Sequence, residues 1–310
     1  NGLVDYGNGW IADMVGGEFE HDDADPSSFD PDGTNVAGLV LGDGSSGQIT
    51  GMAPGAEMVM CEINDEAQYW EAQQYLLSVG TDVVVASFSF KWPDRPDYAM
   101  HRQLAELELA GGISHANSTG NQGNQLGTHP LPFNIPAPAN APGPWRNPAD
   151  QGAGRAAITA VGAITLPDDA LFTPSGRGPS AWEDFTLYDP AWPHPLNPAY
   201  VDYPVGGFGG SGVGLIKPDL VAYTNVNTTA LTTGYTEFSG TSASTPQVGG
   251  ALALLLQAQP AALPRHLAAA LQLGAVDLGP AGKDNAFGAG KLDAFAAARR
   301  LQVLVRANPP

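Results

Sequence analysis

Short apolar segments alternate along the chain with longer stretches in which apolar positions recur every three or four residues. Short apolar runs are typical of strands buried in a parallel sheet, and the longer repeats are typical of amphipathic helices. Their alternation predicts βαβ units, and hence an α/β fold built on a parallel sheet. The predicted strands are 3–5, 58–63, 82–87, 113–118, 158–163 and 220–223.

Helical patterns lie between and after these strands. Asp65 is placed to accept a hydrogen bond from the first turn of a helix in which Tyr69, Ala72, Leu76 and Val79 share one face. A proline in the first turn costs a helix nothing, because the N–H that it lacks has no partner there. The other predicted helices are 98–110, 248–256, 264–273 with Pro264 in its first turn, and 292–303.

Two segments interrupt this alternation. Residues 123–154 are rich in proline, asparagine and glycine, and residues 178–212 carry aromatic and acidic residues and prolines without a period. Loops of this length inside a compact domain usually have a function. A chain of 310 residues is long enough to bury a large core, and we expect one domain with two long loops.

The charge balance limits the classes of partner. The formal net charge is −19, from 32 acidic and 13 basic residues. A surface this acidic argues against nucleic-acid and anionic-membrane partners. The longest strongly apolar run, 251–256, is far shorter than the ~20 residues that a membrane-spanning helix needs.

The single cysteine, Cys61, excludes a disulfide within the chain, and its apolar neighbours predict a buried thiol. The first residues do not have the basic and then apolar pattern of a signal peptide. We therefore expect the numbered chain to be a mature or trimmed form, and we expect the protein to be secreted.

One serine stands where a turn of small residues meets the predicted helix at 248–256. Gly240 carries no Cβ that would block the approach of a substrate, and Ser242 falls at the start of the helix. The positive end of the helix dipole favours negative charge on the Ser242 oxygen. This setting favours a serine nucleophile, although such a serine can also serve only as a helix cap.

The segment 238–248, Phe-Ser-Gly-Thr-Ser-Ala-Ser-Thr-Pro-Gln-Val, resembles the nucleophile segment of the subtilisin-like serine proteases, or subtilases. Three other segments resemble subtilase motifs in the family's chain order, and five more resemble the segments between them. The resemblance implies a subtilisin-like three-layer α/β fold, with a mostly parallel central sheet and helices on both faces, as one catalytic domain over residues 1–310. The matching segments are 2–7, 32–38, 118–123, 51–56, 160–163, 172–179, 217–222 and 287–294.

The resemblance also implies roles for individual residues. Ser242 matches the nucleophile, Asp5 the triad aspartate, and Asn121 the side-chain donor to the oxyanion. A peptide or protein substrate is expected as the partner, with a propeptide as a further one, and no cofactor is required. The residues implied in substrate binding are Ser87, Phe88, Ser89, Phe90, Ser118, Thr119 and Gly120.

One position departs from the family's pattern. In the segment 32–38, Asp32 occupies the place of the catalytic histidine. Two carboxylates a few ångströms apart cannot both stay ionised, so Asp5 and Asp32 are expected to share a proton. The ionised member can then accept the Ser242 proton. A carboxyl group with an ordinary pKa of about 4 is a poor base at neutral pH, so this triad favours acidic conditions.

Two other interpretations stay open. Sedolisins share the fold, use a carboxylate base and have a similar serine segment, but Val36 stands where their second acid is expected and Asn121 replaces their oxyanion aspartate. A catalytically impaired pseudoprotease that binds a peptide or protein partner is favoured by Asp32. It is also favoured by Phe90 and Trp92, which could fill the substrate groove or line an apolar pocket where many relatives have glycine.

Other polar residues were weighed for catalysis and metal binding. A surface or structural role is the better explanation for His21, His115 and His129, and His129 is the least unlikely of the three to replace the missing base. The acidic residues Asp22, Asp23 and Asp25 are candidates for a structural Ca²⁺ site, although a solvated acidic surface explains them as well. No catalytic metal is expected.

Overall fold

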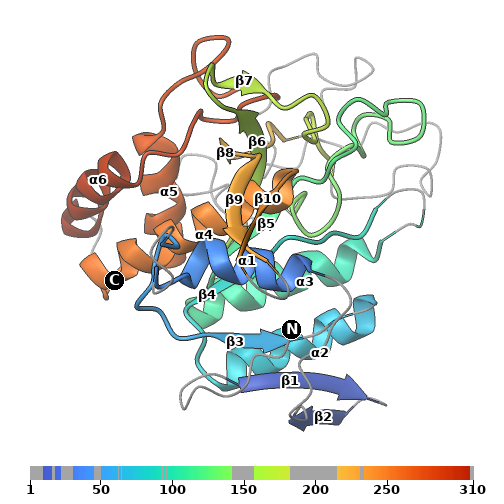
Figure 1. The fold of residues 1–310 in the computed structure, drawn as a ribbon, viewed down its shortest axis with the longest axis vertical. Coiled ribbons are helices and arrows are strands. Elements are labelled where there is room, and N and C mark those ends of the chain that lie inside the picture. The colour runs from blue at the N-terminus through green and yellow to red at the C-terminus, as the bar shows by residue number, and fades with distance from the viewer. Residues whose placement is uncertain are drawn as a thin grey trace.

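The computed structural model describes residues 10–15, 18–21, 31–44, 50–61, 63, 65–91, 94, 96–141, 157–181, 215–230 and 234–307, the first two ranges by their backbone alone. Its central sheet of five strands has the order β4-β5-β6-β7, and β8 also pairs with β6 (Figure 1). Strands β4, β5, β6 and β8 are parallel, and β7 is antiparallel to β6. The strands are Val83–Ala86 (β4), Ser114–Ser118 (β5), Ile158–Thr165 (β6), Ala170–Leu171 (β7) and Leu220–Tyr223 (β8).

Two smaller sheets accompany the central one. In the first, β1 is parallel to β3 and antiparallel to β2, which gives the order β2-β1-β3. The second is the antiparallel hairpin of β9 and β10, which leads directly into the helix that carries Ser242. The strands are Trp10–Val15 (β1), Glu18–His21 (β2), Val59–Cys61 (β3), Val226–Thr229 (β9) and Tyr235–Phe238 (β10).

Helices cover both faces of the central sheet. The strand register places Val84, His115 and Ile158 side by side on one face. Helices α2 and α3 pack against this face, and α4, α5 and α6 pack against the other. The three-layer α/β arrangement is thereby confirmed. The helices are Asp32–Leu41 (α1), Glu66–Ser78 (α2), Tyr98–Gly111 (α3), Thr241–Ala258 (α4), Pro264–Gly274 (α5) and Ala294–Ala307 (α6).

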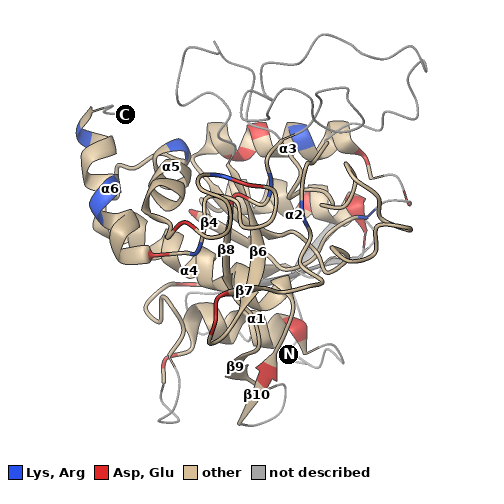
Figure 2. Ribbon diagram, turned by 90° about the horizontal axis from the view of Figure 1, so that it is seen from above, with Lys and Arg blue, Asp and Glu red and all other residues tan. Residues whose placement is uncertain are grey.

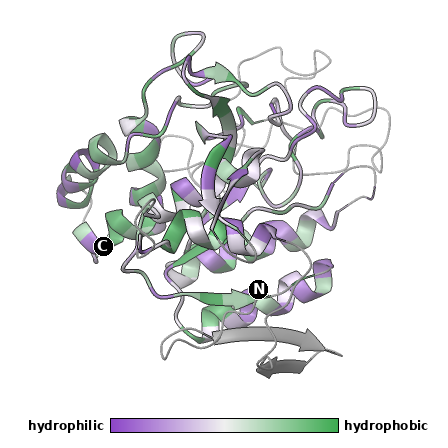
Figure 3. Cartoon of the chain, in the orientation of Figure 1, coloured by the Kyte–Doolittle hydropathy of each residue, from purple (hydrophilic) through white to green (hydrophobic). Residues whose placement is uncertain are grey.

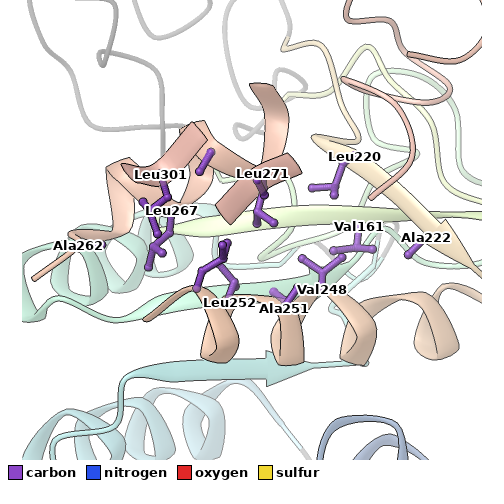
Figure 4. Packing of buried hydrophobic residues seen from close by; sticks show 14 residues of the cluster. Val161, Leu220, Ala222, Val248, Ala251, Leu252, Ala262, Leu267, Leu271 and Leu301 are labelled. Carbon is purple, nitrogen blue, oxygen red and sulfur yellow. The ribbon is translucent and has the colours of Figure 1, made fainter. Parts of the chain in front are cut away.

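The largest apolar cluster joins the sheet to α4, α5 and α6 (Figure 4). Val248 and Leu252 of α4 pack with Val161 of β6, and Leu271 of α5 belongs to the same cluster. Hydrophobic residues accordingly gather in α4 and the central strands (Figure 3). Gly249 permits the close approach of α4 to the sheet, because a Cβ there would lie 2.3 Å from Val85 Cγ2. The nucleophile candidate is therefore carried by a helix embedded in the core.

The predicted elements from residue 58 onward are confirmed, with shifted ends. Strand β6 continues to Thr165, and α6 begins at Ala294 and extends to Ala307. The predicted strand 3–5 lies outside the described residues. Val79 was assigned wrongly to the buried face of α2, because the helix ends at Ser78 and Val79 is 45% exposed.

The structure bears on two expectations drawn from the composition, the burial of Cys61 and the distribution of charged residues. Cys61 packs against an apolar cluster but is only half-buried, and this burial raises the pKa of its thiol to about 11. Asp and Glu residues are spread over the described helices and loops, and the described Lys and Arg residues lie on α3, α5 and α6 and in loops (Figure 2). None of the described helices is both long and apolar enough to cross a membrane.

A buried ionic cluster connects three parts of the fold. Asp219 and Lys217 are both almost fully buried, and their Oδ2 and Nζ atoms are 2.7 Å apart. The Ala160 N–H also donates to Asp219 Oδ2, at 2.8 Å, and Lys283 Nζ lies 3.4 Å from Oδ1. Burial by itself raises the pKa of Asp219, but the charges of Lys217 and Lys283 outweigh it and hold the pKa below its usual value.

Replacing this carboxylate should destabilise the fold in a pH-dependent way. Asp219→Asn leaves Lys217 buried without a counter-charge, and we expect a loss of about 3–5 kcal/mol in the free energy of unfolding at neutral pH. A lowered folded-state pKa contributes stability that is present above the unfolded pKa and is lost as the pH falls through the folded pKa. The deficit of the variant should therefore shrink below about pH 4.

Urea denaturation of wild type and variant at several pH values measures this difference. Asp169→Asn is the control, because Asp169 is paired with Lys291 at the surface, where ion pairs contribute little. Equal losses of unfolding free energy in the two variants, or a deficit of Asp219→Asn that does not depend on pH, would contradict a stabilising role for ionised Asp219 beside Lys217.

Candidate active site

Ser242 lies in the first turn of α4, immediately after a turn that only glycine adopts easily. Gly240 has a φ of 84°, in the left-handed region, and a Cβ at this position would lie 2.8 Å from Asn121 Nδ2. Glycine therefore lets the start of α4 approach Asn121 closely. The N-terminal end of the helix gives the surroundings of the Ser242 hydroxyl a positive potential.

Asn121 is held in position by the residue before Ser242. Its Oδ1 accepts hydrogen bonds from the Thr241 N–H at 2.9 Å and from Thr241 Oγ1 at 3.2 Å. This fixes the orientation of the amide and leaves Nδ2 free to donate toward the Gly240 side. In the described part of the chain, the Ser242 N–H has no hydrogen-bond partner either. Two N–H donors thus lie next to the nucleophile candidate, as an oxyanion requires.

Ser242 makes reciprocal hydrogen bonds with the segment that follows β4. Its hydroxyl donates to the Ser87 carbonyl oxygen at 3.1 Å, and the Ser87 hydroxyl donates to the Ser242 carbonyl oxygen at 3.0 Å. The sequence analysis assigned both serines to the site, and the structure brings them together across 155 positions of sequence separation.

Backbone groups alternate in direction along residues 86–90. The Ala86 and Phe88 carbonyls accept from Asn117 Nδ2, at 2.8 and 3.1 Å, and Phe90 exchanges two backbone hydrogen bonds with Ala137. Ser87 points the opposite way, toward Ser242. By the same alternation Ser89 presents its N–H and C=O on the Ser242 side, and no described residue hydrogen-bonds to either group.

The side chains of Phe88 and Phe90 pack away from this open edge. They form an aromatic cluster with Tyr69 of α2 and His101 of α3, in which Phe90 stacks on His101 at 5.3 Å and Phe88 meets Tyr69 edge-on at 5.5 Å. The idea that Phe90 fills the substrate groove is therefore wrong, since its ring is stacked against the helical layer. Trp92 lies outside the described residues.

The other predicted substrate-binding segment, Ser118, Thr119 and Gly120, begins with the last residue of β5 and is buried. The Thr119 N–H donates to the Val161 carbonyl at 3.0 Å, and the Gly120 carbonyl accepts from the Gly176 N–H at 2.9 Å. These bonds fix the segment between β6 and the 172–178 turn, directly before Asn121. The structure thus gives these residues a part in positioning Asn121.

Asp32 is the first residue of α1 and is exposed to solvent. Positions 32, 36 and 39 share one face of the helix, and Val36 and Leu39 pack in a cluster with Ala243, the residue after Ser242. Thr228 and Thr229 hydroxyls donate to the Asn35 and Thr34 carbonyls and hold α1 against β9. Asp32 therefore lies at the end of the face that packs on the start of α4.

Comparison with known proteins agrees with this geometry. Residues 12–290 match the subtilase family. The chain belongs to this family. The fold, the order of the motifs and the serine at the start of α4 are thus those of a family of serine peptidases.

Two relatives and one solved structure illustrate the range of similarity. The chain is 29% identical to the subtilisin-like protease SBT6.1 of Arabidopsis thaliana over 240 residues, which is 76% of this chain and 18% of that protein. It is 27% identical to the human membrane-bound transcription factor site-1 protease over 230 residues, which is 72% and 17%. The chain thus spans less than a fifth of the length of these relatives.

The structure of the prenylagaramide maturation protease PagA superposes with a TM-score of 0.62 at 19% identity. The superposition covers 97% of this chain and 91% of that one. At this identity the likeness shows the fold alone, and it supports the three-layer arrangement described above.

Several predicted site residues lie outside the described part of this subtilase. Asp5 and the acidic residues Asp22, Asp23 and Asp25 are among them, so the triad aspartate and the calcium site stay predictions. The family match begins at residue 12 and therefore does not include Asp5.

The described histidines are engaged elsewhere. His115 is completely buried with Nδ1 2.9 Å from Glu108 Oε1, and His101 Nε2 lies 2.7 Å from Glu66 Oε1. His129 is half-buried beside Thr128, and this burial, followed by the Lys91 charge, lowers its pKa. No histidine in the described ranges hydrogen-bonds to Ser242, whose hydroxyl donates to Ser87. The structural interpretation of His115 is confirmed.

Proposed function

We propose that this subtilase is a serine endopeptidase-type hydrolase with Ser242 as nucleophile and an aspartate, Asp32, in place of the usual histidine. The observation that carries the proposal is the arrangement of Ser242 at the start of α4 beside the Asn121 amide, with the Ser87 edge on the other side. A scaffold that only binds has no need for a serine and an oxyanion donor in this arrangement.

In the proposed reaction, the Ser242 hydroxyl leaves the Ser87 carbonyl and gives its proton to the carboxylate pair that includes Asp32. The oxygen forms a bond to the carbonyl carbon of the substrate, and Asn121 Nδ2 and the Ser242 N–H donate to the resulting oxyanion. The carboxylic acid then returns the proton to the leaving amine. Water hydrolyses the acyl-enzyme by the same proton path in reverse. Because aspartate is shorter than histidine, a water molecule between Asp32 and Ser242 is part of the proposal.

The second member of the carboxylate pair is Asp5 by motif resemblance. Replacing Asp5 by asparagine tests this assignment.

The substrate is proposed to bind as an added strand along Ser89. The open N–H and C=O of Ser89 face the Ser242 side, and main-chain hydrogen bonds of this kind bind extended peptides. A peptide paired there passes the nucleophile, because Ser87 and Ser89 present their backbone groups in the same direction. Glycine is not needed at position 90, since the Phe90 ring packs against His101 on the helical side.

The alternative function is a catalytically impaired pseudoprotease that binds a peptide or protein partner at the same edge. Two features favour it: by motif resemblance Asp32 matches the histidine position, and the Ser242 hydroxyl donates to the Ser87 carbonyl rather than to a base. Both functions use the open backbone edge at Ser89, because a peptide can bind there whether or not it is cleaved.

Ser242 should react with a serine-directed fluorophosphonate at pH 5–6 faster than free serine does, because the helix end and the oxyanion donors stabilise the product. Intact-mass spectrometry detects the adduct, and Ser242→Ala is the control. A complete lack of adduct between pH 4 and pH 9 would favour the pseudoprotease.

The pH–rate profile of peptide hydrolysis should be bell-shaped and displaced to acid. Two interacting carboxyl groups handle the proton, so activity requires one of them ionised and the other protonated. Rates on a peptide library between pH 3 and pH 9 measure the profile. A rate that rises through pH 7 instead would point to a recruited histidine, and His129→Ala would then abolish activity.

Asp32→His should raise peptidase activity at neutral pH by about 10²-fold or more, the scale of general-base catalysis. An imidazole at the start of α1 would be longer than the carboxylate and a better base at pH 7. Asp82→His, at an exposed position at the opposite end of β4, is the matched control for adding a histidine. Unchanged activity of a folded Asp32→His variant would support the pseudoprotease.

A further inference from the structure

Asn117 is a fully buried amide in the penultimate position of β5. In the register of the sheet it lies opposite Ala86, the last residue of β4. Its Nδ2 donates two hydrogen bonds, to the Ala86 carbonyl at 2.8 Å and to the Phe88 carbonyl at 3.1 Å. One side-chain nitrogen thus holds two carbonyl groups that are two residues apart on the neighbouring strand.

The residue between these two carbonyls is Ser87. When the carbonyls of residues 86 and 88 are both drawn toward β5, the carbonyl of residue 87 must point to the opposite side. On that side it accepts the hydrogen bond of the Ser242 hydroxyl, while the Ser87 hydroxyl donates to the Ser242 carbonyl. The amide of Asn117 therefore determines the direction of the group that orients the nucleophile candidate.

No other type of side chain of this size supplies the same pair of bonds. An asparagine nitrogen carries two N–H donors, whereas serine or threonine has one, and leucine or valine has none. Loss of the amide would leave the carbonyls of Ala86 and Phe88, at and just beyond the end of β4, without their donor, and the Ser87 segment would no longer be confined to one orientation.

We propose that Asn117 is a positioning residue for Ser242, which acts through the backbone of 86–88. It contacts neither the nucleophile nor the predicted path of the substrate. Two measurements test this role. Labelling of Ser242 rests on the proposed nucleophilic role of Ser242, whereas hydrogen–deuterium exchange does not.

Asn117→Ala should lower the rate of fluorophosphonate labelling of Ser242 by about tenfold or more, the effect of one lost hydrogen bond on a barrier. In the same variant, hydrogen–deuterium exchange should speed up in peptides covering 86–90 and 240–244. Asn140→Ala is the matched control, because Asn140 is also a buried amide, and its Nδ2 donates to the Ala181 carbonyl at 2.9 Å, away from Ser242. The control should keep the wild-type labelling rate and exchange in both segments.

A folded Asn117→Ala variant that labels and exchanges like wild type would overturn the proposal, and so would equal losses in Asn140→Ala. Asn117→Asp, which keeps the shape but removes the N–H donors, provides the same readouts if the alanine variant does not fold. If wild type itself does not label, the proposed function has failed. The exchange of 86–90 and 240–244 then decides the positioning role by itself.

Discussion

The packing of α4 through the core, with its first turn bonded to the end of β4, is the constraint on which the rest of the site depends. The reciprocal hydrogen bonds of Ser87 and Ser242 form only because α4 lies against the strand, which Gly249 permits by its missing Cβ. Apolar side chains of α4 are buried against strands and against α5, so the helix cannot shift without opening the largest cluster of the core. The nucleophile candidate is thereby held as rigidly as the fold itself.

The two faces of the central sheet contribute differently to the site. On the face of α4 to α6 the contacts are apolar and supply the stability that fixes Ser242. On the face of α2 and α3, aromatic and titratable groups lie behind the strand ends: Tyr69 and His101 support Phe88 and Phe90, and Glu108 pairs with His115. Burial, followed by the nearby Glu108 carboxylate, raises the pKa of Tyr69 well above its usual value. The layer is thus polar but closely packed, and it turns the bulky residues of 87–90 away from the open edge.

Helix α1 is held in place by contacts of residues other than Asp32. Val36 and Leu39 pack against the start of α4, and the threonines of β9 donate to carbonyls of the helix. Asp32 is the exposed first residue of this helix. In the function proposed above, the effect of an aspartate at this position falls on proton transfer and not on the packing of the helix.

From the sequence alone, the hydrophobic pattern predicted the α/β class and most of the central elements, and local motifs predicted that Ser242, Asn121 and Ser87 belong to the site. The predictions of fold and elements succeeded because a buried strand and a buried helix each have a signal within a few neighbouring residues. The hydrogen bonds of Asn117, the stacking of Phe90 on His101 and the exposure of Val79 were not predictable in this way. They depend on which strands are neighbours, where a helix ends and which side chains meet across long sequence separations. Only the tertiary structure decides these contacts, because no local pattern of residues specifies the partner.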